Sequence, residues 1–313
     1  MTRAVYVVEH KTTSKDIGLG SPYWQRLTLD DQVSTYMAGA RMLGHEPRGV
    51  LYDVIRKPAE RPYEVNSKRS EPEPAEAFAE RIREKIGAEP DKYFQLGKVV
   101  RFAEEERVAA QNAWIYSQQI LAFRNAGQFP QNVDACETWG RFCDFWGVCA
   151  GEKSLDDATL YRKKAELNEE LAASTPASDG KKRLPVLSAS AMRALRQCPR
   201  LYEFKYEQGY EPHERAGALR FGTLIHLALE TWWLTNKDLD AALAKLSGES
   251  DPYDLARATE LMRGYHVRWS DAEHTVLAVE KEFSGPLVNP ETGGVSRTFV
   301  RGGKMDAICE VNE

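Results

Sequence analysis

The pattern of hydrophobic and polar residues predicts a chain in which strands and helices alternate. A first strand is expected over residues 3–8, where β-branched and aromatic residues dominate. The stretch TLDDQVSTYMAGARMLG (28–44) is typical of a helix, with Thr28 as its N-cap and Gly44 as its stop. A second strand follows over 48–58. This strand–helix–strand order predicts a partly parallel sheet covered by helices.

The rest of the chain continues with helices and strands and then closes with two strands. Helices are expected near 75–87, 103–125, 156–172, 188–206, 219–234 and 251–269, and strands near 92–101, 275–283 and 297–311. Residues 172–187 are rich in small and polar residues and in Pro and Gly, which is typical of a linker. A linker at this position divides the chain into residues 1–171 and residues 188–313.

Composition describes an ordinary globular protein. Of the 313 residues, 42% are hydrophobic and 28% are charged, so the chain can bury a sizeable core. No apolar run approaches the roughly 18 residues that span a bilayer, and no signal-peptide pattern is present, so we expect a cytoplasmic protein without a membrane partner. The net charge of -5 gives no overall attraction to nucleic acid, and binding of phosphates would need a local basic surface.

Two predicted strands carry acids among apolar residues. Asp306 lies in the last strand and Glu9 at the end of the first. A buried carboxylate is costly unless it is paired, protonated or bound to a metal ion, and carboxylates are suitable ligands for Mg²⁺ or Mn²⁺. Lys11 is two residues beyond Glu9 and so points to the same face of the strand. This pattern predicts a metal site with a cation that can stabilise the charge on a phosphate.

Cysteine spacing also indicates a site. Three of the five cysteines, Cys136, Cys143 and Cys149, fall within fourteen residues. An odd number of cysteines without an export signal argues for thiols or metal ligands and against disulfides. The alternative is three core thiols, since aromatic residues surround them. Cys309, in the last strand, is expected to be an ordinary core residue.

The acids and the lysine resemble a known nuclease core. Asp306 together with Glu9-His10-Lys11 resembles the D…(D/E)xK core of the PD-(D/E)XK nucleases. Other segments resemble the RecB/AddB-like iron–sulfur branch of that superfamily, which includes the CRISPR-adaptation nucleases. FGTLIHLALE is similar to the GxxxH helix of that branch. The resemblance implies that His226 is the third metal ligand, beside Asp306 and Glu9.

Two further segments extend the resemblance. DDQVSTY is similar to the QxxxY motif, which implies that Gln32 and Tyr36 organise the site near the lysine and the DNA backbone. CPRLYEFKY and CETWGRFCDFWGVC resemble the split cysteine set that binds a [4Fe–4S] cluster. The implied ligands are Cys198, Cys136, Cys143 and Cys149. Four thiolates are the number such a cluster requires, and zinc is the main alternative.

The order of the motifs departs from the family. There the histidine helix and the aspartate strand precede the (D/E)xK strand and the QxxxY helix, whereas here they follow. Placing residue 313 before residue 1 restores the family order. We therefore expect an α/β protein with a restriction-endonuclease-like central mixed sheet flanked by helices, circularly permuted at a hairpin turn, and with a helical iron–sulfur region. A swapped dimer is the alternative to permutation.

The function implied by the resemblance is metal-dependent hydrolysis of DNA. We expect an Mg²⁺- or Mn²⁺-dependent exonuclease that acts on single strands or duplex ends in repair or recombination, with a structural [4Fe–4S] cluster. A helicase or a DNA-integration protein is a possible partner for such an enzyme. The alternatives are a non-catalytic DNA-binding or scaffold module that keeps the fold and the cluster, and a zinc-stabilised RNA-processing nuclease.

Overall fold

The computed structural model describes residues 3–65, 70–138, 140–165, 167, 184–213 and 217–312. Its centre is a six-stranded sheet in the order β3-β2-β1-β10-β7, with β9 paired to the other edge of β10. These strands are β1 Arg3–Thr13, β2 Pro47–Arg56, β3 Phe94–Val99, β7 Val186–Leu187, β9 His274–Val288 and β10 Val295–Asn312. β1 is parallel to β2 and antiparallel to β10, so the predicted mixed sheet is confirmed.

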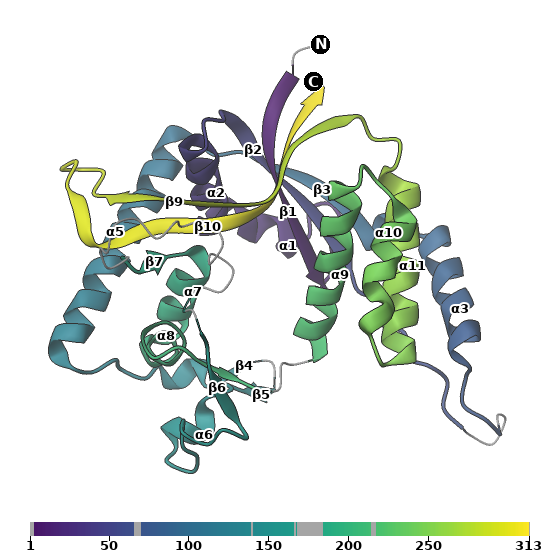
Figure 1. Ribbon diagram of the computed structural model, residues 1–313, viewed down its shortest axis with the longest axis horizontal. Coiled ribbons are helices and arrows are strands. Elements are labelled where there is room, and N and C mark those ends of the chain that lie inside the picture. The colour runs from purple at the N-terminus through teal and green to yellow at the C-terminus, as the bar shows by residue number, and fades with distance from the viewer. Residues whose placement is uncertain are drawn as a thin grey trace.

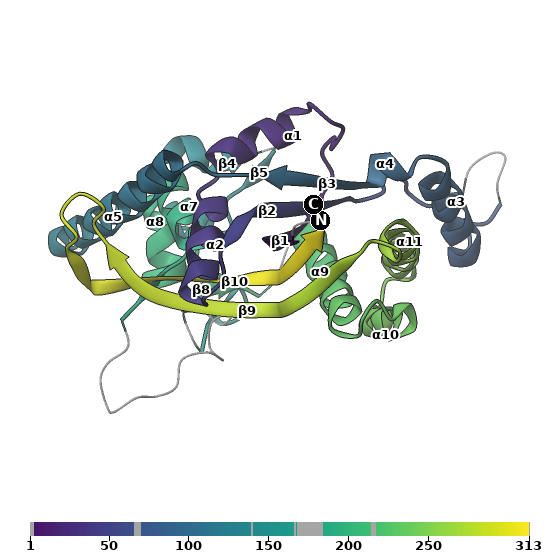
Figure 2. The ribbon, with the colours of Figure 1, turned by 90° about the horizontal axis from the view of Figure 1, so that it is seen from above.

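The first and last strands lie side by side at the centre of this sheet (Figure 1). β1 and β10 pair from Arg3↔Asn312 to Val8↔Ala307. The inner part of this stretch, residues 6–8 of β1 and 307–309 of β10, is apolar and buried, as expected for the middle of a covered sheet. The N- and C-terminal ends of the described chain therefore meet at one end of the sheet, as Figure 2 shows from above.

Helices cover both faces of the sheet. On one face lies α2, Asp31–Met42, whose Val33, Tyr36 and Met37 pack against β1, β2 and β10. The other face is covered by α3 Ala75–Ala88, α9 Gly217–Leu234, α10 Leu239–Ala244 and α11 Pro252–Trp269 (Figures 1 and 2). One hydrophobic core therefore lies on each face of the sheet at β1 and β10. None of the helices in the described ranges is both long and apolar enough to cross a membrane.

The remaining elements lie mainly around the cysteines and the long helix α5. They are α1 Pro22–Gln25, η1 Arg26–Leu29, α4 Pro90–Tyr93, α5 Ala103–Ala126, η2 Val133–Ala135, β4 Glu137–Thr138, β5 Arg141–Phe142, α6 Trp146–Cys149, β6 Tyr161–Lys163, α7 Ala189–Gln197, α8 Pro199–Tyr202, η4 Glu203–Glu207, β8 Tyr210–Pro212 and η5 Lys245–Gly248. The segment with the first three cysteines thus consists of short strands, turns and the single-turn helices η2 and α6, whereas α7, α8 and η4 make the region around Cys198 helical.

Several predicted boundaries need correction. The helix predicted from Thr28 begins instead at Asp31, because the side chain of Asp30 accepts the backbone N–H of Gln32 and acts as the N-cap. The helix predicted near 156–172 is wrong where the structure describes it, because residues 161–163 form β6 and pair with β8. Residues 172–183 of the predicted linker lie outside the described residues, and residues 186–187 form β7 of the main sheet.

Candidate active site

The candidate site is a cavity of about 390 Å³ between the sheet and the helices α2, α7 and α9. Residues of both sequence halves line it. Among the lining residues are all six that the sequence predicted for the active site: Glu9, Lys11, Gln32, Tyr36, His226 and Asp306. The four predicted cluster cysteines lie elsewhere and line a different cavity.

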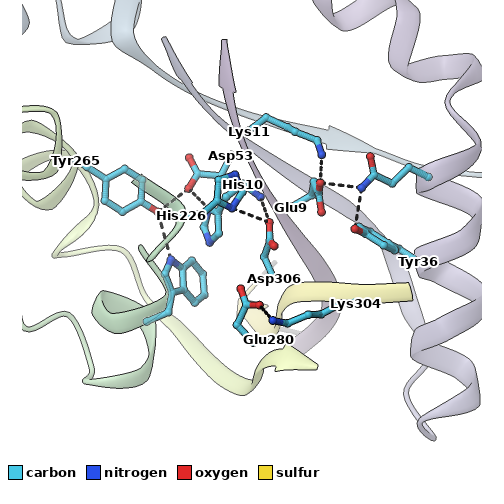
Figure 3. Close-up of polar contacts among 12 residues, drawn as sticks. Glu9, His10, Lys11, Tyr36, Asp53, His226, Tyr265, Glu280, Lys304 and Asp306 are labelled. Atoms are coloured by element: carbon cyan, nitrogen blue, oxygen red, sulfur yellow. Dashed lines mark hydrogen bonds and ion pairs between the residues drawn. The ribbon is translucent and has the colours of Figure 1, made fainter. Parts of the chain in front are cut away.

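The pairing of β1 with β10 brings the two acids together. The ladder between these strands ends at Val8↔Ala307, so Glu9 and Asp306 follow immediately beyond its last pair. There the backbone N–H of His10 donates to the side chain of Asp306 in β10, with 2.7 Å between the nitrogen and Oδ2 (Figure 3). An acid from the last strand is thereby fixed beside the acid of the first.

Glu9 is held by side chains of β1 and α2. Its Oε1 forms an ion pair with Lys11 and accepts a hydrogen bond of 2.9 Å from Gln32 Nε2. The same amide nitrogen donates to the hydroxyl of Tyr36 at 2.7 Å. Lys11 therefore contacts Glu9 directly, and Tyr36 is connected to Glu9 through Gln32 (Figure 3). The other oxygen, Glu9 Oε2, is buried and has no hydrogen-bond partner among the described residues.

Helix α9 brings His226 to the same cavity. Its Nδ1 lies 4.0 Å from Asp306 Oδ2. Gly222, one turn earlier, explains how the helix approaches so closely: a Cβ at this position would lie 3.0 Å from Thr12 Oγ1 of β1. The glycine of the GxxxH pattern thus lies at a tight contact, where a Cβ would require either the Thr12 side chain or α9 to shift slightly.

Burial and the neighbouring charges shift the pKa values in the cavity. Burial, and then the charge of Glu9, raise the pKa of Asp306 to about 7. Burial, together with the positive charges of His10 and Lys11, lowers the pKa of His226 to about 3, so its imidazole is neutral and can bind a metal ion. Burial also disfavours charge on Lys11, but the contacts with Glu9 outweigh it and leave the pKa raised.

Metal binding was tested on the donor atoms that the structure shows. Within the described ranges, no group of three or more His, Cys, Asp or Glu side chains is arranged so that it could hold a metal ion. The cavity nevertheless combines the buried carboxylate of Glu9 with the half-buried carboxylate of Asp306, and the Glu9 atom Oε2 is without a hydrogen-bond partner among the described residues. Hard divalent cations prefer such oxygen ligands, so the donor chemistry fits Mg²⁺ or Mn²⁺ once the ion pair of Lys11 with Glu9 opens.

The structure brings the four predicted cluster cysteines to one place. They line a single small cavity of about 20 Å³: Cys136, Cys143, Cys149 and Cys198. Burial raises the pKa of the Cys143 and Cys149 thiols. The backbone N–H of Asn132 donates to Cys198 Sγ at 3.4 Å, which joins the two cysteine segments. Cys309 is 1% exposed and packs in the core on the α9 side of the sheet.

Sequence reasoning missed polar partners that become visible only with the strand register. His10 is opposite Asp53 in the parallel β1–β2 pair, and its Nδ1 lies 2.8 Å from Asp53 Oδ2. Burial lowers the pKa of His10, but the hydrogen bond and charge of Asp53 outweigh this effect and leave the pKa raised. The signal in the sequence was a polar residue within each of two apolar strands.

A second ion pair also lines the cavity. Lys304, two residues before Asp306 in β10, pairs with Glu280 of β9 (Figure 3). Glu280 adopts φ 50°, a left-handed conformation that non-glycine residues seldom take within a strand. The sequence alone does not identify this pair, because the pairing depends on the β9–β10 register.

Comparison with known proteins gives one match. Residues 186–310 match the family model described as the PD-(D/E)XK nuclease superfamily. The matched range contains His226 and Asp306, whereas Glu9 and Lys11 lie outside it. No curated protein and no solved structure matches the chain. The comparison therefore shows that residues 186–310 are similar to the PD-(D/E)XK nuclease superfamily.

Proposed function

We propose that this protein is an Mg²⁺- or Mn²⁺-dependent deoxyribonuclease, and specifically an exonuclease acting on single-stranded DNA or duplex ends. The observation that carries the proposal is the meeting of Asp306 with Glu9 and Lys11 in one cavity, although about 300 residues separate them in the chain. The nuclease superfamily match over residues 186–310 supports the same activity.

Each side chain has a role in the proposed mechanism. Asp306, Glu9 and His226 would hold the divalent cation, which supplies Lewis-acid activation of a water molecule and of the scissile phosphate. Lys11, released from Glu9, would neutralise the charge that develops on the phosphate.

The α2 side of the cavity would keep the first strand's acid in place. Gln32 donates to Glu9 and to Tyr36, so the amide fixes the carboxylate relative to α2. Because the imidazole of His226 is neutral, it can offer a nitrogen lone pair to the cation without first losing a proton.

A circularly permuted nuclease domain is the proposed origin of the motif order. Two observations support it: β1 and β10 are antiparallel neighbours whose outer ends meet, and the family model matches only the second half of the chain. In this proposal, residues 1–171 and 188–313 are the two halves and residues 172–187 join the former termini. The two acids meet within a single chain, which favours a monomer over a swapped dimer.

We also propose a structural [4Fe–4S] cluster held by Cys136, Cys143, Cys149 and Cys198. Support comes from the four free thiols that line one cavity and come from both halves of the chain. Such a cluster would tie α7 and α8 to the segment 136–149. An absorbance spectrum of protein purified without oxygen tests this directly, since a cluster absorbs in the visible range whereas zinc does not.

A DNA degradation assay tests the activity. We expect labelled single-stranded or blunt-ended DNA to be degraded with Mg²⁺ or Mn²⁺, and the activity to be abolished in Lys11→Ala. Circular single-stranded DNA should stay intact, because an exonuclease needs an end. If the wild type binds DNA but leaves it intact with every divalent cation, the protein is the alternative, a non-catalytic DNA-binding or scaffold module. A helicase or a DNA-integration protein remains the proposed partner in either case.

A further inference from the structure

His10 adjoins all three candidate metal ligands, Glu9, Asp306 and His226. It follows Glu9 in β1, and its backbone N–H donates to Asp306 Oδ2 at 2.7 Å. Its ring faces that of His226 edge-on, with 6.5 Å between the ring centroids. Any displacement of His10 therefore changes the separation of ligands that come from β1, β10 and α9 (Figure 3).

Buried hydrogen bonds hold the ring of His10 in place. Its Nδ1 lies 2.8 Å from Asp53 Oδ2 of β2, and that oxygen also accepts a hydrogen bond of 2.5 Å from the hydroxyl of Tyr265 on α11. Trp233 of α9 packs against His10, with 5.4 Å between ring centroids, and its indole N–H lies 3.4 Å from the Tyr265 hydroxyl. The network thus joins β1 and β2 to both α9 and α11.

The network also sets where α9 lies relative to β1. His226 and Trp233 are seven residues apart, so they lie two turns apart on the same face of the helix. Because Trp233 rests on the His10 ring, the position of that ring determines how far α9 stands from the strand. His226, on the same face, moves with it.

The composition of this network argues against a purely packing role. His10, Asp53 and Tyr265 are 3%, 2% and 1% exposed. Polar side chains therefore occupy core positions that apolar side chains could also fill. Burial of a polar pair is costly, and well-packed apolar residues of similar volume often stabilise a core more. What apolar residues would not supply is a fixed orientation of the strand segment between Glu9 and Lys11.

We propose that His10, Asp53 and Tyr265 are positioning residues of the metal site: they set the separation of Glu9, Asp306 and His226 that a divalent cation requires. This inference rests on the proposed nuclease function. Residues that orient metal ligands typically change metal affinity about 10- to 100-fold when they are replaced. We therefore expect weaker Mn²⁺ binding and a lower kcat in the variants, with little change in the KM for DNA.

The test measures Mn²⁺ binding directly, from the electron paramagnetic resonance signal of free Mn²⁺, alongside DNA cleavage by the same full-length chain. His10→Ala should weaken Mn²⁺ binding about 10- to 100-fold, and His10→Asn, which keeps an N–H donor near Asp53, should restore part of it. Tyr265→Phe removes only a hydroxyl and should weaken binding about 10-fold, at the lower end of that range. This milder variant keeps the proposal testable if His10→Ala does not fold.

Glu260→Gln is the matched control. Glu260 lies on α11 like Tyr265, is 2% exposed, and accepts hydrogen bonds of 2.8 and 3.0 Å from Arg83. It does not line the catalytic cavity. Its replacement should lower thermal stability without altering the Mn²⁺ affinity.

The outcomes separate the two proposals. Suppose that the wild type binds Mn²⁺ and degrades DNA, and that Tyr265→Phe and His10→Asn bind Mn²⁺ as tightly as Glu260→Gln does. The positioning role is then overturned, and the nuclease function stands. If the wild type neither binds Mn²⁺ nor degrades DNA, the nuclease function fails and the positioning role fails with it.

Discussion

Replacement of Asp306 by Asn should stabilise the metal-free protein while it removes the activity. The side chain of Asp306 is 16% exposed, and its pKa is raised from 3.8 to about 7, first by burial and then by the charge of Glu9. The folded protein therefore binds this proton more tightly than the unfolded chain does. Stability contributed by the protonated form is lost as the pH rises from about 4 to about 7. Asn has no proton to lose, and its Oδ1 can still accept the N–H of His10.

The size of the effect follows from the pKa shift. A difference of about three pKa units corresponds to about 4 kcal/mol, since each unit is worth about 1.4 kcal/mol. This is an upper value, because the interaction with Glu9 is shared between the two acids. At about pH 8 the wild type has lost the full stabilisation that the protonated Asp306 provides. At about pH 5 it has lost only about 1.5 kcal/mol of it. The stability advantage of the Asn variant should thus grow by about 2.5 kcal/mol between these pH values.

Urea unfolding in the presence of a chelator measures this advantage at both pH values. A divalent cation added at the higher pH should stabilise the wild type and leave Asp306→Asn nearly unchanged, because binding to the folded state alone shifts the unfolding equilibrium. An advantage that is the same at both pH values, or a variant less stable than the wild type at about pH 8, would refute the reasoning.

Three further changes test other parts of the site. Gly222→Ala should push α9 away from β1 and lower kcat about tenfold, measured by cleavage kinetics; an unchanged rate would contradict the close-approach argument. Gln32→Ala should lower kcat about tenfold, because the Glu9 carboxylate loses the hydrogen bond that holds it in place. DNA binding should be retained in a gel-shift assay. Cys198→Ala should abolish visible absorbance and lower the melting temperature, whereas the core variant Cys309→Ala should keep the absorbance; equal spectra would exclude the cluster.

The acids of the candidate site could be predicted from the sequence because they interrupt apolar strands. Asp306 and Glu9 are carboxylates in segments whose other residues form the core, and the mixed sheet follows from the order of strands and helices. Gly222 and His226 were predicted through the GxxxH pattern, although only the structure shows that Thr12 limits the space at the glycine.

Features that depend on strand register could not be predicted in this way. The pair of His10 with Asp53 requires the parallel register of β1 with β2. The pair of Lys304 with Glu280 requires the antiparallel register of β9 with β10. The false helix near 156–172 has a related cause. Its Lys- and Glu-rich residues favour a helix locally, but residues 161–163 pair with β8 instead, and tertiary pairing outweighs weak local propensity.

The location of a bound Mn²⁺ ion tests the central claim most directly. A crystal of the wild type soaked in Mn²⁺ should show an anomalous scattering peak with an oxygen of Glu9 and an oxygen of Asp306 at about 2.2 Å from it, and Lys11 turned away from Glu9. A protein that degrades DNA in Mn²⁺ but binds the ion without these two carboxylates would contradict the account.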